Sequence, residues 1–166
     1  MQVAVKDACI LIDLANGGLL DQWFQLGIET FTTDLVLRQI ANPAQRKEVD
    51  AFVTAKRLKV ITLNGAQIEA MVSELGHLRI GLADQTVLYL ALEMENAILL
   101  TGDRRLRLEG LRRSVEVRGL LWALDELVAK RLLPPKLAAG KLKKMKEQGA
   151  YLPPDEFRQR LARWGG

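Results

Sequence analysis

Short apolar runs alternate with amphipathic stretches along most of the chain. Runs rich in aliphatic and β-branched residues predict strands over 3–8, 29–33, 59–63, 97–101 and 115–117. Apolar residues spaced three and four positions apart predict helices over 13–24, 35–40, 46–56, 68–75, 83–95, 104–113, 120–133, 135–149 and 154–164. Strands that alternate with helices predict an α/β fold with a central parallel sheet flanked by helices, followed by a helical C-terminal extension.

The net charge is concentrated near the C-terminus. The 166-residue chain has a formal charge of +4, but residues 1–133 contain 16 basic and 17 acidic side chains, whereas residues 134–166 contain 8 basic and 3 acidic ones. Pro134 and Pro135 interrupt the helical pattern at this change. We therefore expect an α/β domain over 1–133 and a basic helical extension over 134–166. The excess of charge favours a polyanionic or acidic partner, or forms a solvated helix face.

Composition excludes several classes of protein and of site. Hydrophobic residues make up 49% and charged residues 27%, which is typical of a globular protein. The sequence has neither an apolar stretch of about 20 residues nor a signal-peptide pattern, so we expect a cytoplasmic protein without a membrane segment. One cysteine and one histidine cannot form a disulfide or a Cys/His zinc site, and Cys9 is expected to be a small buried residue. A catalytic metal would need oxygen ligands.

Acidic side chains follow several of the predicted strands. Asp7 follows the first strand, Asp103 follows the run AILLT, and Asp84 begins a long apolar helix. Ligands of open parallel sheets bind outside the carboxyl ends of the strands, and converging carboxylates repel one another unless a cation neutralises them. Mg²⁺ and Mn²⁺ prefer such oxygen ligands. Asp7, Asp84 and Asp103 are therefore the predicted metal ligands and catalytic residues.

Other readings of the polar positions stay open. Asp34 and Asp84 are also suitable as helix N-caps, and Asp103 as a turn residue. The hydroxyl of Thr101 is suited to orient a ligand carboxylate. Three basic residues directly after Asp103 form either a phosphate-binding surface or a solvated helix face: Arg104, Arg105 and Arg107.

Three segments, in their order, resemble the PIN-domain nucleases, of the small single-domain prokaryotic kind: VKDACILIDLA, TTDLVLRQI and GLADQTVLYLALEMENAILLTGDRRLR. The resemblance implies a PIN-like fold and a Mg²⁺- or Mn²⁺-dependent endoribonuclease that cleaves single-stranded RNA. Such proteins are often the toxin of a toxin-antitoxin pair, so an antitoxin protein is an implied partner. A homodimer is a further candidate assembly, because small domains with exposed apolar helices frequently dimerise.

The resemblance also assigns roles to individual residues. Asp7, Asp84 and Asp103 match the first, third and fourth acidic positions of the family. The second family position is normally a glutamate, and here it corresponds to Gln39, which offers one neutral oxygen and no charge. Asp34 compensates only if its helix begins close to the site.

Two other functions compete with an active nuclease. The substitution at Gln39 is compatible with a catalytically weak or inactive PIN-like module that binds RNA or a protein. A receiver-like signalling domain also places aspartates at strand ends and binds Mg²⁺, but it needs an acidic pair near Asp7 and a late-strand lysine, and neither pattern is evident here.

Overall fold

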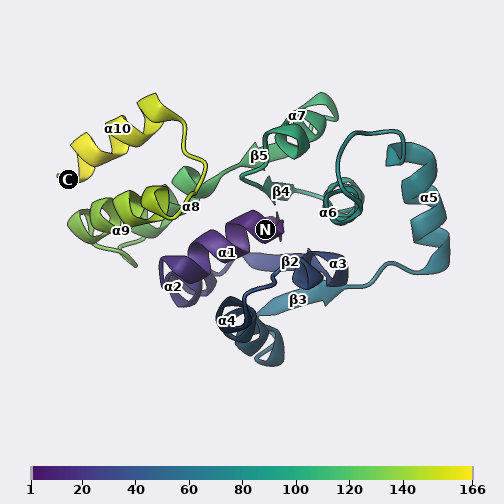
Figure 1. The fold of residues 1–166 in the computed structure, drawn as a ribbon, viewed down its shortest axis with the longest axis horizontal. Coiled ribbons are helices and arrows are strands. Elements are labelled where there is room, and N and C mark those ends of the chain that lie inside the picture. The colour runs from purple at the N-terminus through teal and green to yellow at the C-terminus, as the bar shows by residue number, and fades with distance from the viewer. Residues whose placement is uncertain (1, 166) are drawn as a thin grey trace.

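A five-stranded parallel sheet forms the centre of the computed structural model, which describes residues 2–165 (Figure 1). All four pairings between neighbouring strands are parallel, as the sequence predicts. The sheet has the order β3-β2-β1-β4-β5. The strands are β1 (Val3–Lys6), β2 (Glu29–Thr33), β3 (Leu58–Ile61), β4 (Ala97–Leu100) and β5 (Glu116–Arg118).

Helices cover both faces of this sheet. Figure 1 shows α3 (Asp34–Arg38), α5 (Gly65–Leu75), α6 (Leu82–Glu93) and α7 (Arg104–Arg112) on one side. The other side carries α1 (Ala8–Asn16), α2 (Leu20–Gln25), α4 (Pro43–Thr54) and α8 (Leu120–Ala129). Over residues 2–165 no helix has both the length and the apolar character that crossing a membrane requires. The predicted α/β fold is confirmed.

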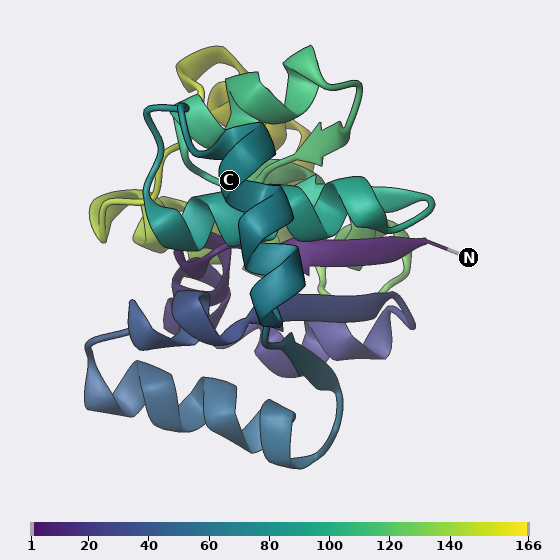
Figure 2. The same ribbon diagram turned by 90° about the vertical axis from the view of Figure 1, so that its right-hand side faces the viewer.

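The order of the strands defines where a ligand can bind. From β1 the chain moves to β2 on one side, and later to β4 on the other side of β1. The direction of winding therefore reverses between β1 and β4, and the crevice at the carboxyl ends of these two strands is the usual ligand position in open α/β sheets. Figure 2 shows β1 and β2 side by side, both ending at the edge away from the N-terminus. Receiver domains have the order 2-1-3-4-5, so the receiver-like alternative is wrong.

The first helix begins earlier than its sequence pattern predicts. The strand expected over 3–8 ends at Lys6, and α1 starts at Ala8 with Asp7 as its N-cap. Residues 8–12 are almost entirely apolar, so they show no helical periodicity and read as a strand continuation. The helix expected over 13–24 is divided in two at Gly17 and Gly18, where Gly18 has a φ of +63° that favours glycine.

The C-terminal extension packs into the main core. Helix α9 (Pro135–Glu147) buries Ala138, Leu142 and Met145, and the Nζ of Lys141 donates a hydrogen bond to the carbonyl of Gly17 at 2.6 Å. Helix α10 (Pro154–Trp164) packs on α9 and is tied to α8 by hydrogen bonds from the guanidinium of Arg160 to the carboxylate of Asp125. We propose that the boundary after residue 133 separates a nearly neutral region from a basic one, and that both regions share this core.

Gly110 allows α7 to lie directly against the sheet. A Cβ at this position would lie 2.8 Å from Cγ2 of Val117 and 3.1 Å from Cδ2 of Leu99. We expect Gly110→Val to lower the free energy of unfolding by roughly 1–3 kcal/mol, because the added side chain overpacks this contact. Urea denaturation measures the change. Gly140→Ala is the control, since nothing lies within 4 Å of that helical glycine, and it should be neutral or stabilising. An equally stable Gly110→Val variant would contradict the close packing.

Candidate functional site

Asp7 lies at the carboxyl end of β1 and is almost completely buried, with 1% of its surface exposed. Its Oδ1 accepts a hydrogen bond from the backbone N–H of Ile10 at 3.0 Å, and its Oδ2 accepts one from the hydroxyl of Thr101. Burial raises the pKa of Asp7 to about 7; the two hydrogen bonds oppose this rise, and the nearby charges of Asp84 and Asp103 add to it. The buried carboxylate is therefore poorly stabilised by the protein alone.

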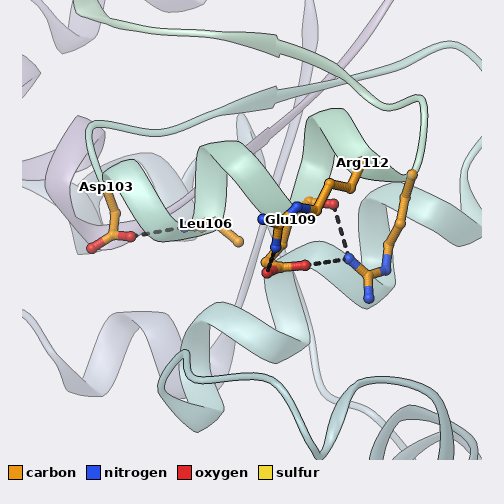
Figure 3. A network of polar contacts seen from close by, with 5 residues as sticks. Asp103, Leu106, Glu109 and Arg112 are labelled. Atoms are coloured by element: carbon orange, nitrogen blue, oxygen red, sulfur yellow. Dashed lines mark hydrogen bonds and ion pairs between the residues drawn. The ribbon is translucent and has the colours of Figure 1, made fainter.

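Thr101 connects the ends of the two central strands. Besides donating to Asp7, its Oγ1 accepts a hydrogen bond from the backbone N–H of Asp103 at 2.9 Å. Asp103 in turn caps α7, because its Oδ1 accepts from the N–H of Leu106 at 2.8 Å (Figure 3). One carboxylate oxygen of Asp103 is used for this cap, and no hydrogen bond within residues 2–165 uses the other. The geometry is compatible with the orienting role predicted for Thr101.

Asp84 lies in the first turn of α6 and is partly exposed. Burial raises its pKa, and the charge of Asp103 raises it further. The alternative role as an N-cap is wrong, since the N-cap of α6 is Gly81. The start of α6 is fixed against the end of β2 by a hydrogen bond of 2.7 Å between the hydroxyls of Thr86 and Thr33. The three aspartates thus come from three elements and influence one another electrostatically.

The donor set fits a hard divalent cation in its chemistry. The charges of Asp84 and Asp103 raise the pKa of Asp7, and the charge of Asp103 raises the pKa of Asp84, so a nearby cation would stabilise the ionised carboxylates. Carboxylate oxygen is also the ligand type that Mg²⁺ and Mn²⁺ prefer. Within residues 2–165, however, no three His, Cys, Asp or Glu side chains are gathered closely enough to form a ready-made metal site. Asp7, Asp84 and Asp103 therefore stay predicted ligands, coupled by charge across the strand ends.

Gln39 and Asp34 occupy the two ends of the short helix α3. Thr33, not Asp34, is the N-cap, because its Oγ1 accepts a hydrogen bond from the N–H of Val36. Asp34 follows in the first turn, with Oδ2 3.8 Å from Nη2 of Arg38. Gln39 is the C-cap and is exposed. The charge of Asp34 is not among those that raise the pKa of Asp7 or Asp84.

The basic residues of α7 and of its C-cap, Arg113, fall into two groups. Arg112 and Arg113 form ion pairs with Glu109 at 2.8 and 2.6 Å, in the network drawn in Figure 3. The three residues of the predicted phosphate-binding surface are exposed and form no ion pair with any residue in 2–165: Arg104, Arg105 and Arg107. Their positive charge is therefore uncompensated directly beside Asp103.

A cavity of about 440 Å³ adjoins the candidate site on the side of Asp103. It lies between α7, the turn from β5 into α8, and the connection from α9 to α10. Sequence reasoning missed the part of its wall that contains Tyr151, because the position of the extension depends on long-range packing. The lining residues are Thr101, Gly102, Asp103, Arg104, Arg107, Leu108, Val117, Arg118, Gly119, Leu120, Leu121, Trp122, Tyr151, Leu152, Pro153, Glu156 and Arg160.

Two further residues near Asp7 have a burial that their residue type does not suggest. Cys9 is exposed, so its predicted burial is wrong; it occupies an outward position on α1, next to Gly102. Lys6 is fully buried, and its Nζ lies 3.3 Å from the ring centroid of Trp23. Burial lowers the pKa of Lys6 well below its usual value, although the charge of Asp7 opposes this. An apolar run surrounds Lys6 in the sequence, and nothing in that run indicates where the amine lies.

A protein-family model matches almost the whole chain. Residues 3–166 match a family model that is described as a PIN domain. The matched region contains all three aspartates, Gln39 and the C-terminal extension. A search of curated proteins found no matching sequence.

Proposed function

The chain belongs to the PIN domain family, and from this premise we propose that it is a divalent-cation-dependent endoribonuclease that hydrolyses phosphodiester bonds of single-stranded RNA. The family is of the nuclease type, and PIN domains generally depend on divalent metal ions. The observation that most supports the proposal is the electrostatic coupling of Asp7, Asp84 and Asp103 at the reversal point of the sheet. Carboxylates that lie close together repel both one another and a phosphodiester, and a bound cation removes this repulsion.

The proposed roles follow from the positions of the side chains. Asp7, Asp84 and Asp103 would hold Mg²⁺ or Mn²⁺, and Thr101 would orient the carboxylate of Asp7 through its hydrogen bond. When bound, such a cation supplies an activated water and neutralises charge on the phosphate. Arg104, Arg105 and Arg107 provide cationic contacts for the phosphates on either side of the scissile bond.

Cleavage of short labelled RNA tests this proposal. Purified protein incubated with single-stranded RNA and Mn²⁺ should yield internal cleavage products, EDTA should prevent them, and excess Mg²⁺ or Mn²⁺ should restore them. DNA of the same sequence and duplex RNA serve as comparison substrates. Absence of products with Mg²⁺ and with Mn²⁺, from protein shown to be folded, would contradict an active nuclease.

We propose further that this nuclease acts as the toxin of a toxin-antitoxin pair. Induced expression in a bacterial host should then arrest growth, and an Asp84→Asn variant should not. Co-expression of a small neighbouring coding sequence should relieve the arrest if it encodes the antitoxin. Size-exclusion chromatography with light scattering would determine in the same preparations whether the chain forms the predicted homodimer. Growth unaffected by an RNA-cleaving protein would separate the nuclease from the toxin role.

A catalytically weak binding module is the second candidate, and Gln39 favours it. Replacing one neutral amide by a carboxylate strengthens the attraction for a divalent cation if position 39 faces the three aspartates. We expect Gln39→Glu to tighten Mn²⁺ binding by roughly tenfold and to raise the cleavage rate, since this restores the family glutamate. Calorimetry and RNA cleavage measure the two effects.

The control for this prediction is Gln148→Glu, because Gln148 is likewise an exposed helix C-cap but belongs to α9. It should change neither quantity. The gain from Gln39→Glu should also disappear when it is combined with Asp84→Asn. An unchanged Gln39→Glu variant would mean that position 39 lies outside the site, and Asp34 would then be the next residue to substitute.

A further inference from the structure

The two sides of the cavity beside Asp103 differ in chemistry. On one side, Arg104 and Arg107 of α7 are exposed and unpaired within residues 2–165. On the other side, the connection from α9 to α10 contributes Tyr151, which is 63% exposed. Figure 1 shows this connection passing beside the start of α8. Uncompensated cations therefore face the cavity from one element and an aromatic ring from another.

The side chain of Tyr151 is mostly exposed, so its burial contributes little to the stability of the fold. Its neighbour Leu152 is 7% exposed and anchors the connection in the core, and Pro153 and Pro154 restrict the backbone that follows. The ring of Tyr151 is thus held at the surface by a fixed backbone. A large exposed aromatic side chain in such a place is well suited to stack on an unpaired base.

The other charged groups of the cavity are largely neutralised. Arg160 is paired with Asp125 at 2.7 Å and also lies 3.7 Å from Glu156, while Arg118 is paired with Glu116 at 3.1 Å. Positive charge is therefore concentrated at the α7 side, next to Asp103. A volume of about 440 Å³ is within the range of sites that hold a small ligand or one unit of a polymer.

We propose that this cavity is a nucleotide subsite for single-stranded RNA beside the scissile bond, in which Arg104 and Arg107 bind phosphate and Tyr151 stacks on a base. The inference rests on the proposed nuclease function for its substrate, and it adds that the C-terminal extension forms part of the substrate surface. An acidic peptide would use the arginines but gains less from an aromatic ring. The shared wall at Asp103 also places this cavity directly beside the predicted catalytic edge.

Binding of an eight-nucleotide single-stranded RNA with a 5′ fluorescein label, measured by anisotropy in EDTA, separates binding from cleavage. Tyr151→Ala should weaken binding by roughly 5- to 150-fold, the range expected for loss of one stacked base, and Tyr151→Phe should retain it. Leu137→Ala is the control, because Leu137 is also half exposed in the extension but does not line the cavity. Binding of the corresponding RNA duplex should not respond to Tyr151→Ala, since its bases are already stacked.

The arginines are tested in the same assay. Arg104→Gln and Arg107→Gln together should weaken binding and reduce its dependence on salt, because fewer phosphate contacts release fewer counterions. Lys143→Gln with Lys144→Gln removes the same charge from exposed positions of α9 that do not line the cavity, and it should have the smaller effect. Equal effects of the two double variants would indicate a general charge attraction and would overturn the subsite.

Photocrosslinking with 5-iodouridine at each position of the RNA locates the contact directly. A crosslink mapped to Tyr151 supports the subsite even if no cation promotes cleavage, in which case only the nuclease proposal fails. Normal cleavage with crosslinks elsewhere and an unaffected Tyr151→Ala variant would overturn the subsite and leave the nuclease intact. Polyglutamate that displaces the RNA is the test for an acidic peptide. If it binds Tyr151→Ala and the wild type with equal affinity, and no crosslink maps to Tyr151, the cavity would be assigned to an acidic peptide instead.

Discussion

The Asp84→Asn variant is expected to lose cation-dependent RNA cleavage by roughly 100-fold or more while remaining folded, because it removes charge from the predicted cation site and keeps the shape of the side chain. Asp103→Asn should behave alike. Asparagine still caps a helix, so α7 keeps its N-terminal hydrogen bond to Leu106. Initial rates with Mn²⁺ and circular dichroism of the same samples measure activity and folding.

Asp21→Asn provides the matched control. Asp21 is exposed in the first turn of α2, as Asp84 lies in the first turn of α6, but it contributes no charge to the three-aspartate group. Cleavage by this variant should equal that of the wild type. Full activity of both Asp84→Asn and Asp103→Asn would remove these residues from the site and contradict the proposed arrangement.

The stability of the protein without divalent cations should fall as the pH rises from about 4 to about 7. The pKa of Asp7 is raised from 3.8 to about 7, so the folded state binds the proton more tightly than the unfolded state in this interval. Stability from this group is complete below pH 3.8 and is lost as the pH approaches 7. The separation corresponds to at most about 4 kcal/mol. Asp13, whose pKa burial raises to about 6, contributes in the same direction.

Urea denaturation in EDTA between pH 4.5 and pH 8 checks this dependence. Asp7→Asn should flatten the profile and raise the free energy of unfolding at pH 8 by roughly 1–3 kcal/mol, since no charge is then buried. Addition of Mn²⁺ at pH 8 should stabilise the wild type, because a ligand that binds only the folded state shifts the equilibrium, and it should stabilise Asp7→Asn less. Parallel profiles for the two proteins would show that Asp7 is not the group responsible.

The sheet can be predicted from the sequence, because its strands are short and apolar and are separated by helices with clear periodicity. The run from Ala97 to Leu100 is an example, since a strand buried on both faces has a continuous apolar sequence. The start of α1 cannot be predicted in this way. Its first five residues are also mostly apolar, and the start of the helix is marked by the capping hydrogen bond from the N–H of Ile10 to Asp7, which the apolar pattern does not indicate.

Part of the candidate site can be predicted from the sequence, for a similar reason. Asp7 and Asp103 follow neighbouring parallel strands, so their common edge follows from the fold class alone. The position of Tyr151 could not be predicted from the sequence, because its place beside α7 depends on how residues 134–166 pack on α8. The exposure of Cys9 was missed because an apolar sequence neighbourhood does not report which way a single helical side chain points.

The hydrogen bond between Thr101 and Asp7 joins residues 94 positions apart, and this separation bears on how the protein folds. Every strand pair within residues 2–165 is parallel, so none of these pairs can form as a local hairpin and each requires closure of a long loop. Folding should therefore be slow for a chain of this length, with β1 and β4 meeting late. In a partly folded chain that lacks the β1-β4 pairing, Asp7 and Asp103 are not held at a common edge of the sheet. The proposed chemistry is therefore confined to the completely folded protein.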